Sequence, residues 1–159
     1  MWNGDVYEGK MVNEFVEGNG KYTTSEEQRM RGIGSEISTA DSASKPGPKI
    51  EFEGYYLNGE KSGIGHFVWA DESEYQGDFK NNKFHGQGSY KWANGRSYTG
   101  GWWNGKMHDT GELTLPDGCI YVGEFQFDMR HGTGKMTWPN GKWYQGEWFE
   151  GKQHGFGTY

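Results

Sequence analysis

A unit of 23 residues recurs along this chain and limits its folds more than any other feature. Each copy begins with an aromatic residue and has glycine two positions later, as in Tyr144-Gln-Gly146. With this aromatic as position 0, the last five copies start 23 residues apart, at Phe52, Tyr75, Tyr98, Tyr121 and Tyr144. An earlier copy starts at Tyr7, which leaves room for one irregular unit. A fixed period of this length indicates a repeat architecture in which neighbouring units stack.

Other positions in the unit repeat with a spacing of two. Positions 0 and 4 are bulky and apolar, position 2 is glycine, and positions 11, 13, 15 and 17 continue this glycine-and-bulky pattern. Since side chains alternate along a strand, each run marks one face of a strand. We therefore expect a β-hairpin per unit, with a loop of about six residues, such as 80–85, between its strands. Asn-Gly and Asp-Gly pairs at 94–95, 117–118 and 140–141 are strong signals for tight turns between units.

The apolar material of the chain lies almost wholly in aromatic rings. Glycine accounts for 28 of 159 residues and aromatics for 17%, while mean hydropathy is −1.01. A ring can lie flat over a glycine backbone, and each buried ring removes roughly 150–250 Å² from water. We expect rings and glycines on one face and solvated polar residues on the other, including Asp78, Glu124 and Glu147. The fold class is all-β: an elongated, single-layer antiparallel array of consecutive hairpins.

The pattern Tyr-x-Gly-x-Trp-x-x-Gly-x-x-His-Gly-x-Gly, as in residues 144–157, resembles the MORN repeat. The resemblance covers 52–159 strongly, 7–24 well and 25–51 barely. It implies a twisted hairpin array with an aromatic-lined groove. It also implies a non-enzymatic scaffold in the cytoplasm, associated with the cytoskeleton, a cilium or the inner face of a membrane.

We expect one array over residues 1–159. Its units are expected near 7–29, 30–51 (degenerate or a loop), 52–74, 75–97, 98–120, 121–143 and 144–159 (truncated). The Ser/Ala/Pro-rich stretch 38–48 is typical of a mobile loop. Neither end shows the polar cap of a solenoid, so we expect a fragment of a longer protein.

Several function classes are disfavoured by composition and by the places that reactive residues occupy. A net charge of −6 argues against nucleic-acid binding. The single cysteine, Cys119, excludes an internal disulfide and a cysteine-based zinc cluster. The Gly-x-Gly pairs precede no helix and so do not predict a phosphate loop. We expect no catalysis, no cofactor and no metal.

Histidines recur at position 10, as His85, His108, His131 and His154. Neighbouring units are roughly 9–10 Å apart, which is too far for a shared metal with bonds of about 2 Å. We expect these side chains to hydrogen-bond the hairpin backbone. His66 lies outside this series and is expected on the surface.

A single sheet cannot cover its own apolar face, so part of the ring stripe should stay exposed as an interaction site. We expect the stripe to bind an amphipathic helix or a second copy of the chain. The candidate groove residues are Phe52, Tyr56, Trp69, Tyr75, Phe79, Tyr90, Trp92, Tyr98, Trp102, Tyr121, Phe125, Trp138, Tyr144 and Trp148.

Three further readings stay open. Lys83, Lys106 and Lys152 recur at position 8 and favour an anionic-phospholipid reader, although the net charge disfavours one. The array is alternatively the regulatory part of an enzyme whose catalytic domain is absent. A choline-binding hairpin repeat is less consistent with the unit length.

Three aromatic residues break the alternation of the strands and predict a second aromatic patch on the opposite face: Tyr55, Trp103 and Trp143.

Overall fold

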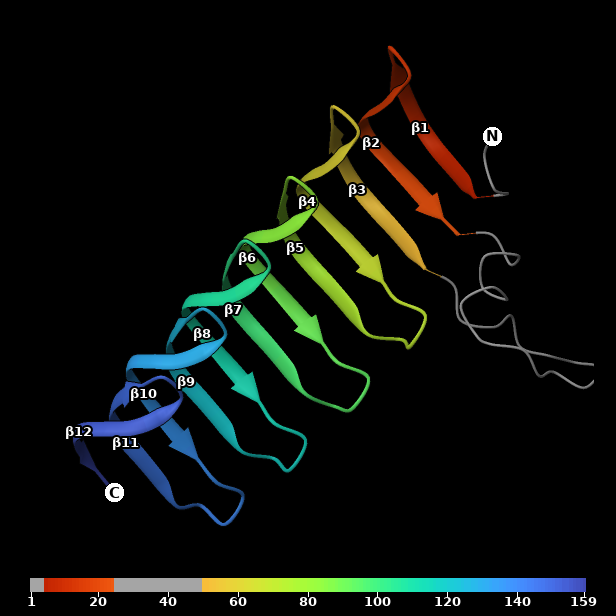
Figure 1. The fold of residues 1–159 in the computed structure, drawn as a ribbon. Coiled ribbons are helices and arrows are strands. Elements are labelled where there is room, and N and C mark those ends of the chain that lie inside the picture. The colour runs from red at the N-terminus through yellow and green to blue at the C-terminus, as the bar shows by residue number, and fades with distance from the viewer. Residues whose placement is uncertain (1–4, 25–49) are drawn as a thin grey trace, which may run out of the picture.

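The computed structural model describes residues 5–24 and 50–159, and the degenerate unit expected at 30–51 lies almost wholly outside them. The described residues form one antiparallel sheet of twelve strands whose order in the sheet is their order in the chain. Figure 1 shows them side by side in an elongated ladder with β1 and β12 at opposite ends. The expected all-β hairpin array is confirmed. The strands are β1 (Val6–Val12), β2 (Phe15–Thr23), β3 (Glu51–Leu57), β4 (Glu60–Val68), β5 (Glu74–Lys80), β6 (Lys83–Lys91), β7 (Ser97–Trp103), β8 (Lys106–Thr114), β9 (Ile120–Gln126), β10 (Met129–Thr137), β11 (Trp143–Phe149) and β12 (Lys152–Thr158).

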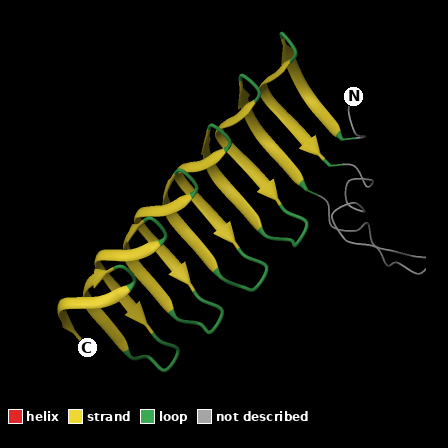
Figure 2. Ribbon diagram, in the orientation of Figure 1, coloured by secondary structure: helices red, strands yellow, loops and turns green. Residues whose placement is uncertain are grey.

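The loop of about six residues expected inside each hairpin is wrong. In β5–β6, Lys80 pairs with Lys83, so Asn81 and Asn82 alone make the turn. Both have positive φ, 50° and 65°, as a type I′ turn requires. The five-residue segments lie between hairpins instead, as at 92–96, where the Asn94 side chain accepts the Arg96 N–H at 3.0 Å. Figure 2 shows these two kinds of loop at opposite ends of the strands.

A bulge near the turn explains the glycine at position 11. Gly77 pairs with Gly88 and Phe79 with Phe84, so residues 85–87 face a single residue, Asp78. Gly86 sits in this bulge with φ +67°, a conformation that glycine adopts without steric cost. The Asp78 carboxylate accepts the Gln87 N–H at 3.0 Å and closes the bulge. Acids on the polar face therefore stabilise the backbone as well as being solvated.

The hairpin β7–β8 exchanges these two residue types. Asp109 stands at position 11, where the other units have glycine, and its φ is +58°. Gly101 stands at position 3, where Asp78, Glu124 and Glu147 stand in three other units. A Cβ at Gly101 would lie 2.4 Å from the His108 carbonyl oxygen and 3.1 Å from the Asp109 Cβ. The acid and the glycine have thus changed places across the bulge.

The rings at position 0 lie over paired glycines. A Cβ at Gly88 would lie 2.3 Å from the Tyr75 hydroxyl oxygen and 2.5 Å from its Cζ. The Tyr75 hydroxyl donates to the Asp78 carbonyl at 2.9 Å, and Tyr98 repeats this bond to Gly101 at 2.9 Å. The expected stacking of rings over glycines is confirmed for positions 2 and 13.

Rings at positions 0 and 4 interlock along the whole array. Tyr98 meets Trp102 of its own unit edge to face at 5.1 Å and Phe125 of the next unit at 5.0 Å. Such T-shaped pairs contribute about 0.5–1.5 kcal/mol beyond the area they bury. The Trp102 indole N–H also donates to the Gly88 carbonyl of the preceding unit at 3.0 Å. Each position-4 ring thus joins its unit to the one before it.

Candidate functional site

The two faces of the sheet differ in chemistry. We call the face that carries positions 0, 4, 9, 15 and 17 the ring face and the opposite one the polar face. Ten of the fourteen rings predicted to contact a partner are 0–5% exposed and therefore have almost no surface with which to touch one. These ten are Phe52, Tyr56, Tyr75, Phe79, Tyr98, Trp102, Tyr121, Phe125, Tyr144 and Trp148.

The other four predicted rings are only half-buried, and they lie together on one strip of the ring face. They are Trp69, Tyr90, Trp92 and Trp138. Trp69 meets Tyr90 at 5.2 Å, and Tyr90 meets Trp92 at 4.3 Å, so the strip continues from one unit to the next. Three half-buried residues that the sequence reasoning left out belong to the same surface: Phe67, Phe84 and Leu115.

This strip borders a hollow in the middle of the array. The hollow has a volume of about 360 Å³. Its floor includes Phe84, Tyr90 and Trp92, and the turn residues Gly105 and Asp128 form one side of it. We call the half-buried strip and this hollow the groove. Aromatic rings line the hollow together with the charged side chains of Arg96 and Asp128, a mixture that suits a peptide with both apolar and polar side chains.

Three cations lie over rings on the same face. The Arg96 guanidinium lies 4.4 Å from the centre of the Trp92 ring. The Lys61 ammonium lies 5.2 Å from the Phe52 ring, and the Arg130 guanidinium lies 4.7 Å from the Trp148 ring. Burial lowers the pKa of the Lys61 ammonium. These contacts are cation–π interactions in a partly desolvated setting, where each contributes about 0.5–2 kcal/mol.

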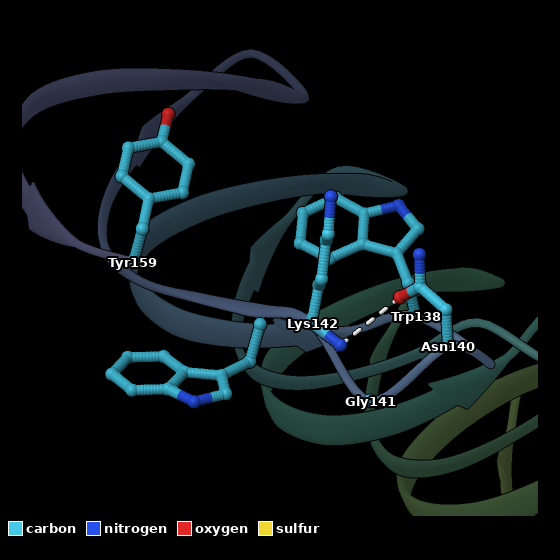
Figure 3. Close-up of a pocket in the computed structure, with 6 residues that line it drawn as sticks. Trp138, Asn140, Gly141, Lys142 and Tyr159 are labelled. Carbon is cyan, nitrogen blue, oxygen red and sulfur yellow. Dashed lines mark hydrogen bonds between the residues drawn. The ribbon is translucent and has the colours of Figure 1, made fainter.

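A second hollow, of about 670 Å³, lies beside the connection 138–142. Figure 3 shows Tyr159 apart from Trp138, with the Lys142 side chain overlapping the Trp138 ring in this view. The Lys142 N–H donates to the Asn140 side chain at 3.0 Å and fixes the connection. Trp138 extends the strip of half-buried rings toward this hollow.

The histidines at position 10 lie on the polar face near the two-residue turns. The Asn104 N–H donates to His85 Nδ1 and the Phe127 N–H to His108 Nδ1, both at 3.5 Å. The expected hydrogen bond to hairpin backbone is thus confirmed for two histidines, each binding the turn of the next unit. His66 is half-buried and lies 3.1 Å from the Glu74 carboxylate, also on the polar face.

Exposed aromatics accompany these histidines. Trp103, Phe127 and Phe149 are each 48–49% exposed. Trp103 lies 4.7 Å from His85 and Phe127 lies 5.1 Å from His108. The position-8 lysines belong to the same edge, since the Lys106 ammonium lies 6.0 Å from the Phe127 ring. We call this the turn edge.

The second aromatic patch predicted from Tyr55, Trp103 and Trp143 is not a single cluster. Tyr55 and Trp103 are 40% and 49% exposed. Trp143 instead contacts Lys135, whose ammonium lies 5.0 Å from its ring, whereas Trp103 packs on His85. Parity placed these rings on the polar face, but no ring contact joins any two of them in the described part of the chain.

Burial raises the pKa of phenol and thiol groups on the ring face. Burial raises the pKa of Tyr75, Tyr98 and Tyr121 well above the usual value for a phenol. Cys119 is buried beside the Asp117 carboxylate, and burial together with that charge raises the pKa of its thiol. A thiol with a raised pKa is a poor nucleophile at neutral pH.

Metal sites and membrane-spanning helices are both absent from the described part of the chain. Within residues 5–24 and 50–159, no three side chains among His, Cys, Asp and Glu come together as a metal site. Across the same ranges there is no helix of the length and hydropathy needed to cross a bilayer.

Comparison with known families identifies the repeat. A family model described as the MORN repeat matches five segments, 52–74, 75–95, 98–120, 121–143 and 144–159. These matches together cover more than half of the chain. No curated protein matches it in sequence.

Proposed function

Because the chain belongs to the MORN-repeat family, whose repeats are generally non-catalytic interaction modules, we propose that it is a scaffold that holds an amphipathic helix of a partner protein in its groove. The observation that carries this proposal is the strip of half-buried Trp and Tyr rings beside the buried rings at positions 0 and 4 of β3 to β11. Tyr and Trp favour such sites because they offer an apolar body with a polar edge.

The spacing of the array supports a helical occupant that lies along it. Neighbouring units are two strand spacings apart, about 9.5 Å. Seven residues of an α-helix rise about 10.5 Å, so an apolar residue at every seventh position meets successive units with a drift of about 1 Å. The hollow between Trp92 and the turn residue Gly105 then receives one such side chain.

Selection from a library of random 20-residue peptides displayed on phage tests this proposal. Binders are measured by fluorescence anisotropy against the wild type and against Trp69→Ala, Trp92→Ala and Trp138→Ala. Trp103→Ala on the polar face is the matched control, because its ring is also partly exposed. We expect the three groove variants to weaken binding at least tenfold and the control to leave it unchanged.

Circular dichroism of the bound peptide identifies its conformation. A rise in helicity on binding supports the proposal. Binders that stay extended, or that pair two copies of the chain in light scattering, contradict a helical occupant. Equal loss of binding in groove variants and in the control contradicts the groove itself.

A second candidate function is binding to anionic phospholipid at the turn edge. Lys106 lies over Phe127 there, and Lys83 and Lys152 hold the same position in their units. Basic residues near a membrane surface contribute about 1 kcal/mol each, and exposed rings suit the headgroup region. Flotation with vesicles containing 30% phosphatidylserine tests it, with Lys83→Gln, Lys106→Gln and Lys152→Gln combined as the variant expected to stay unbound.

We further propose, from the family alone, that such a scaffold works in the cytoplasm at the cytoskeleton, in a cilium or at the inner face of a membrane. Imaging of the tagged chain at its native level tests this. A diffuse distribution that the groove variants do not alter would argue against an attachment of this kind.

A further inference from the structure

In strands β3 to β12 the charged side chains on the ring face are all cations, whereas at the N-terminal end the Asp5 carboxylate accepts a hydrogen bond from the Tyr22 hydroxyl on this face. Within the described strands, no Asp or Glu occupies position 0, 4, 9, 15 or 17 of any unit. Lys61 and Arg130 stand at position 9, and Arg96 ends a connection beside the groove. The protein has 22 acidic residues and a net charge of −6, so cations alone on these strands of the face run against its overall charge.

The lysine–acid ion pairs and the histidine–acid contacts of the described sheet lie on the polar face. Glu74 lies 2.8 Å from Lys91 and 3.1 Å from His66. Lys21 lies 3.9 Å from Glu51, and His108 lies 3.9 Å from Asp109. None of these ion pairs lies on the ring face.

The ring-face cations lack such partners among the described residues. The Lys61 ammonium contacts the rings of Phe52 and Phe67 at 5.2 and 5.4 Å. Arg130 donates one hydrogen bond, to the Gly151 carbonyl at 2.8 Å. The Arg96 Nε is buried and has no hydrogen-bond acceptor. A guanidinium has five N–H donors, so both arginines retain donors for a further acceptor.

One acid is among the residues that line the hollow, and no ion pair joins it to these cations. Asp128 lies in the turn between β9 and β10 and lines the hollow opposite Arg96. Its carboxylate accepts the Met107 N–H at 2.8 Å, and no ion pair joins it to a described cation. Its role in the structure is to fix the turn against the preceding hairpin.

We infer that the helix held in the groove is acidic, with Asp or Glu side chains that pair with Lys61, Arg96 and Arg130 while its apolar face covers the half-buried rings. This inference rests on the proposed function and adds the charge of the partner. Carboxylates pair with guanidinium groups through two parallel hydrogen bonds, and such charge-assisted bonds are stronger than neutral ones.

The placement of the cations fixes where the acids lie on the partner. Lys61 and Arg130 are three units apart, which is about 29 Å at the usual strand spacing. A helix spans this distance with about 19 residues. The partner helix therefore carries acids near both ends of a segment of about 20 residues, with a further acid near its middle for Arg96.

The test uses the groove-dependent peptides from the displayed library, each synthesised in two forms. One form keeps its sequence, and the other has every Asp and Glu replaced by Asn and Gln. We expect the acidic form to bind at least tenfold more tightly in 50 mM NaCl, with the difference shrinking in 500 mM NaCl because salt screens exposed charges.

Two protein variants with the same change of charge give the matched control. The first combines Lys61→Gln, Arg96→Gln and Arg130→Gln, and the second combines Lys83→Gln, Lys106→Gln and Lys152→Gln at the turn edge. We expect the first to remove the preference for the acidic form and the second to keep it. Thermal melts show whether both variants fold. If the first variant does not fold, the paired peptides still test the inference on the wild-type protein.

The outcomes separate this inference from the proposed function. Groove-dependent peptides that are neutral or basic, or whose two forms bind equally, overturn the acidic partner and leave the helix-binding scaffold standing. Equal loss in the two protein variants also overturns it. A selection that yields no peptide sensitive to the groove variants contradicts the proposed function, and this inference fails with it.

Discussion

The hairpins at the two ends of the described sheet have one neighbour each, yet only one of them has a closed core. In β11–β12, Tyr144 and Trp148 are 3% and 5% exposed. In β1–β2, Tyr7 is half-buried and Met11, which holds the position of Trp148, is 46% exposed. Tyr7 and Met11 stand on the edge strand β1 itself, whereas β12, which is exposed at every residue, separates Tyr144 and Trp148 from the opposite edge.

The direction of ring overlap adds to the effect of the sheet edge. A ring at position 4 lies against the position-0 ring of its own unit and that of the preceding unit, as Trp148 does with Tyr144 and Tyr121. Met11 belongs to the first described hairpin, and it is not aromatic. Tyr7 consequently has one edge-to-face partner, Tyr56 of the next hairpin at 5.5 Å. Closure of a unit thus depends on a ring at position 4 and on the unit before it.

The largest expected effect is the difference in stability between alanine substitutions in the two end hairpins. Trp148→Ala should lower the free energy of unfolding by about 3–5 kcal/mol, because it removes a buried ring that joins two units. Met11→Ala should cost about 1 kcal/mol, since nearly half of that side chain is already in water. Urea denaturation measures the totals, and hydrogen exchange locates the loss in β11–β12 or β1–β2. Similar losses at both ends would contradict the overlap argument.

Alkaline pH should unfold the part of the sheet whose tyrosine rings are buried. Burial raises the folded-state pKa of Tyr75, Tyr98 and Tyr121. The stability that each contributes is present below the unfolded value near 10 and is lost as pH rises from there through the raised value. The loss is at most about 1.4 kcal/mol per pH unit for each tyrosine.

Absorbance of phenolate, followed together with circular dichroism between pH 9 and 13, checks this prediction. We expect Tyr7, whose pKa is also raised by burial but whose ring is half-buried, to ionise before unfolding begins. The Tyr7→Phe variant identifies its signal. Ionisation of the interior tyrosines while the sheet stays folded would contradict the prediction.

A smaller contrast concerns the tyrosine hydroxyl. The Tyr75 hydroxyl donates to the Asp78 carbonyl at 2.9 Å, whereas the Tyr7 hydroxyl is 3.4 Å from the Lys10 carbonyl and is exposed. Tyr75→Phe should cost about 1 kcal/mol, and Tyr7→Phe should cost less. Phe52 shows that the unit accepts phenylalanine at position 0. Urea midpoints measured on both variants show which substitution lowers the free energy of unfolding more. A larger decrease for Tyr7→Phe than for Tyr75→Phe would contradict the prediction.

The smallest effect is expected at the connections. Asp117 accepts the Cys119 N–H at 3.0 Å, and hydrogen bonds to Cys119 hold the pKa of this carboxyl below its usual value. Its contribution is therefore present above the unfolded pKa and is lost as pH falls through the lowered one. Asp117→Asn should leave the melting temperature at pH 7 unchanged, because Asn94 and Asn140 make the same bond.

The same variant should be less sensitive to acid. We expect its melting temperature to fall less than that of the wild type between pH 5 and 2.5, with Asp128→Asn as a control in a different kind of turn. A parallel fall in wild type and Asp117→Asn would show that this carboxyl does not contribute to acid unfolding.

Particular residues show which parts of the fold could be predicted from the sequence. The 23-residue spacing and the alternation in each run predicted the hairpins and their order, because hydrophobic alternation marks the face of a strand. The position of the tight turn was missed, although Asn58-Gly59 and Asn104-Gly105 carry the usual signal for a type I′ turn. The only sequence signal for the bulge was the glycine at position 11, and one unit lacks this signal because it has Asp109 there.

The candidate site was less predictable than the fold. Alternation placed Trp92 and Trp102 on one face but did not show that Trp102 is buried beneath its neighbours while Trp92 keeps an open side. Alternation also did not predict that Arg96 lies over the Trp92 ring, because the path of the connection between two units sets this position. Sequence reasoning therefore placed the rings on one face but did not separate the accessible rings from the buried ones, and partner binding at this face stays a prediction.

The sequence by itself determined the unit, its strands, the ring-over-glycine stacking and the order of the sheet, because all of these depend on alternation and spacing within about 23 residues of chain. The tertiary structure decided which rings remain accessible and which charges share their face. Exposure of a ring depends on the unit that precedes it and on the unit that follows. That information lies in the overlap of side chains between hairpins and not in the spacing within any one of them.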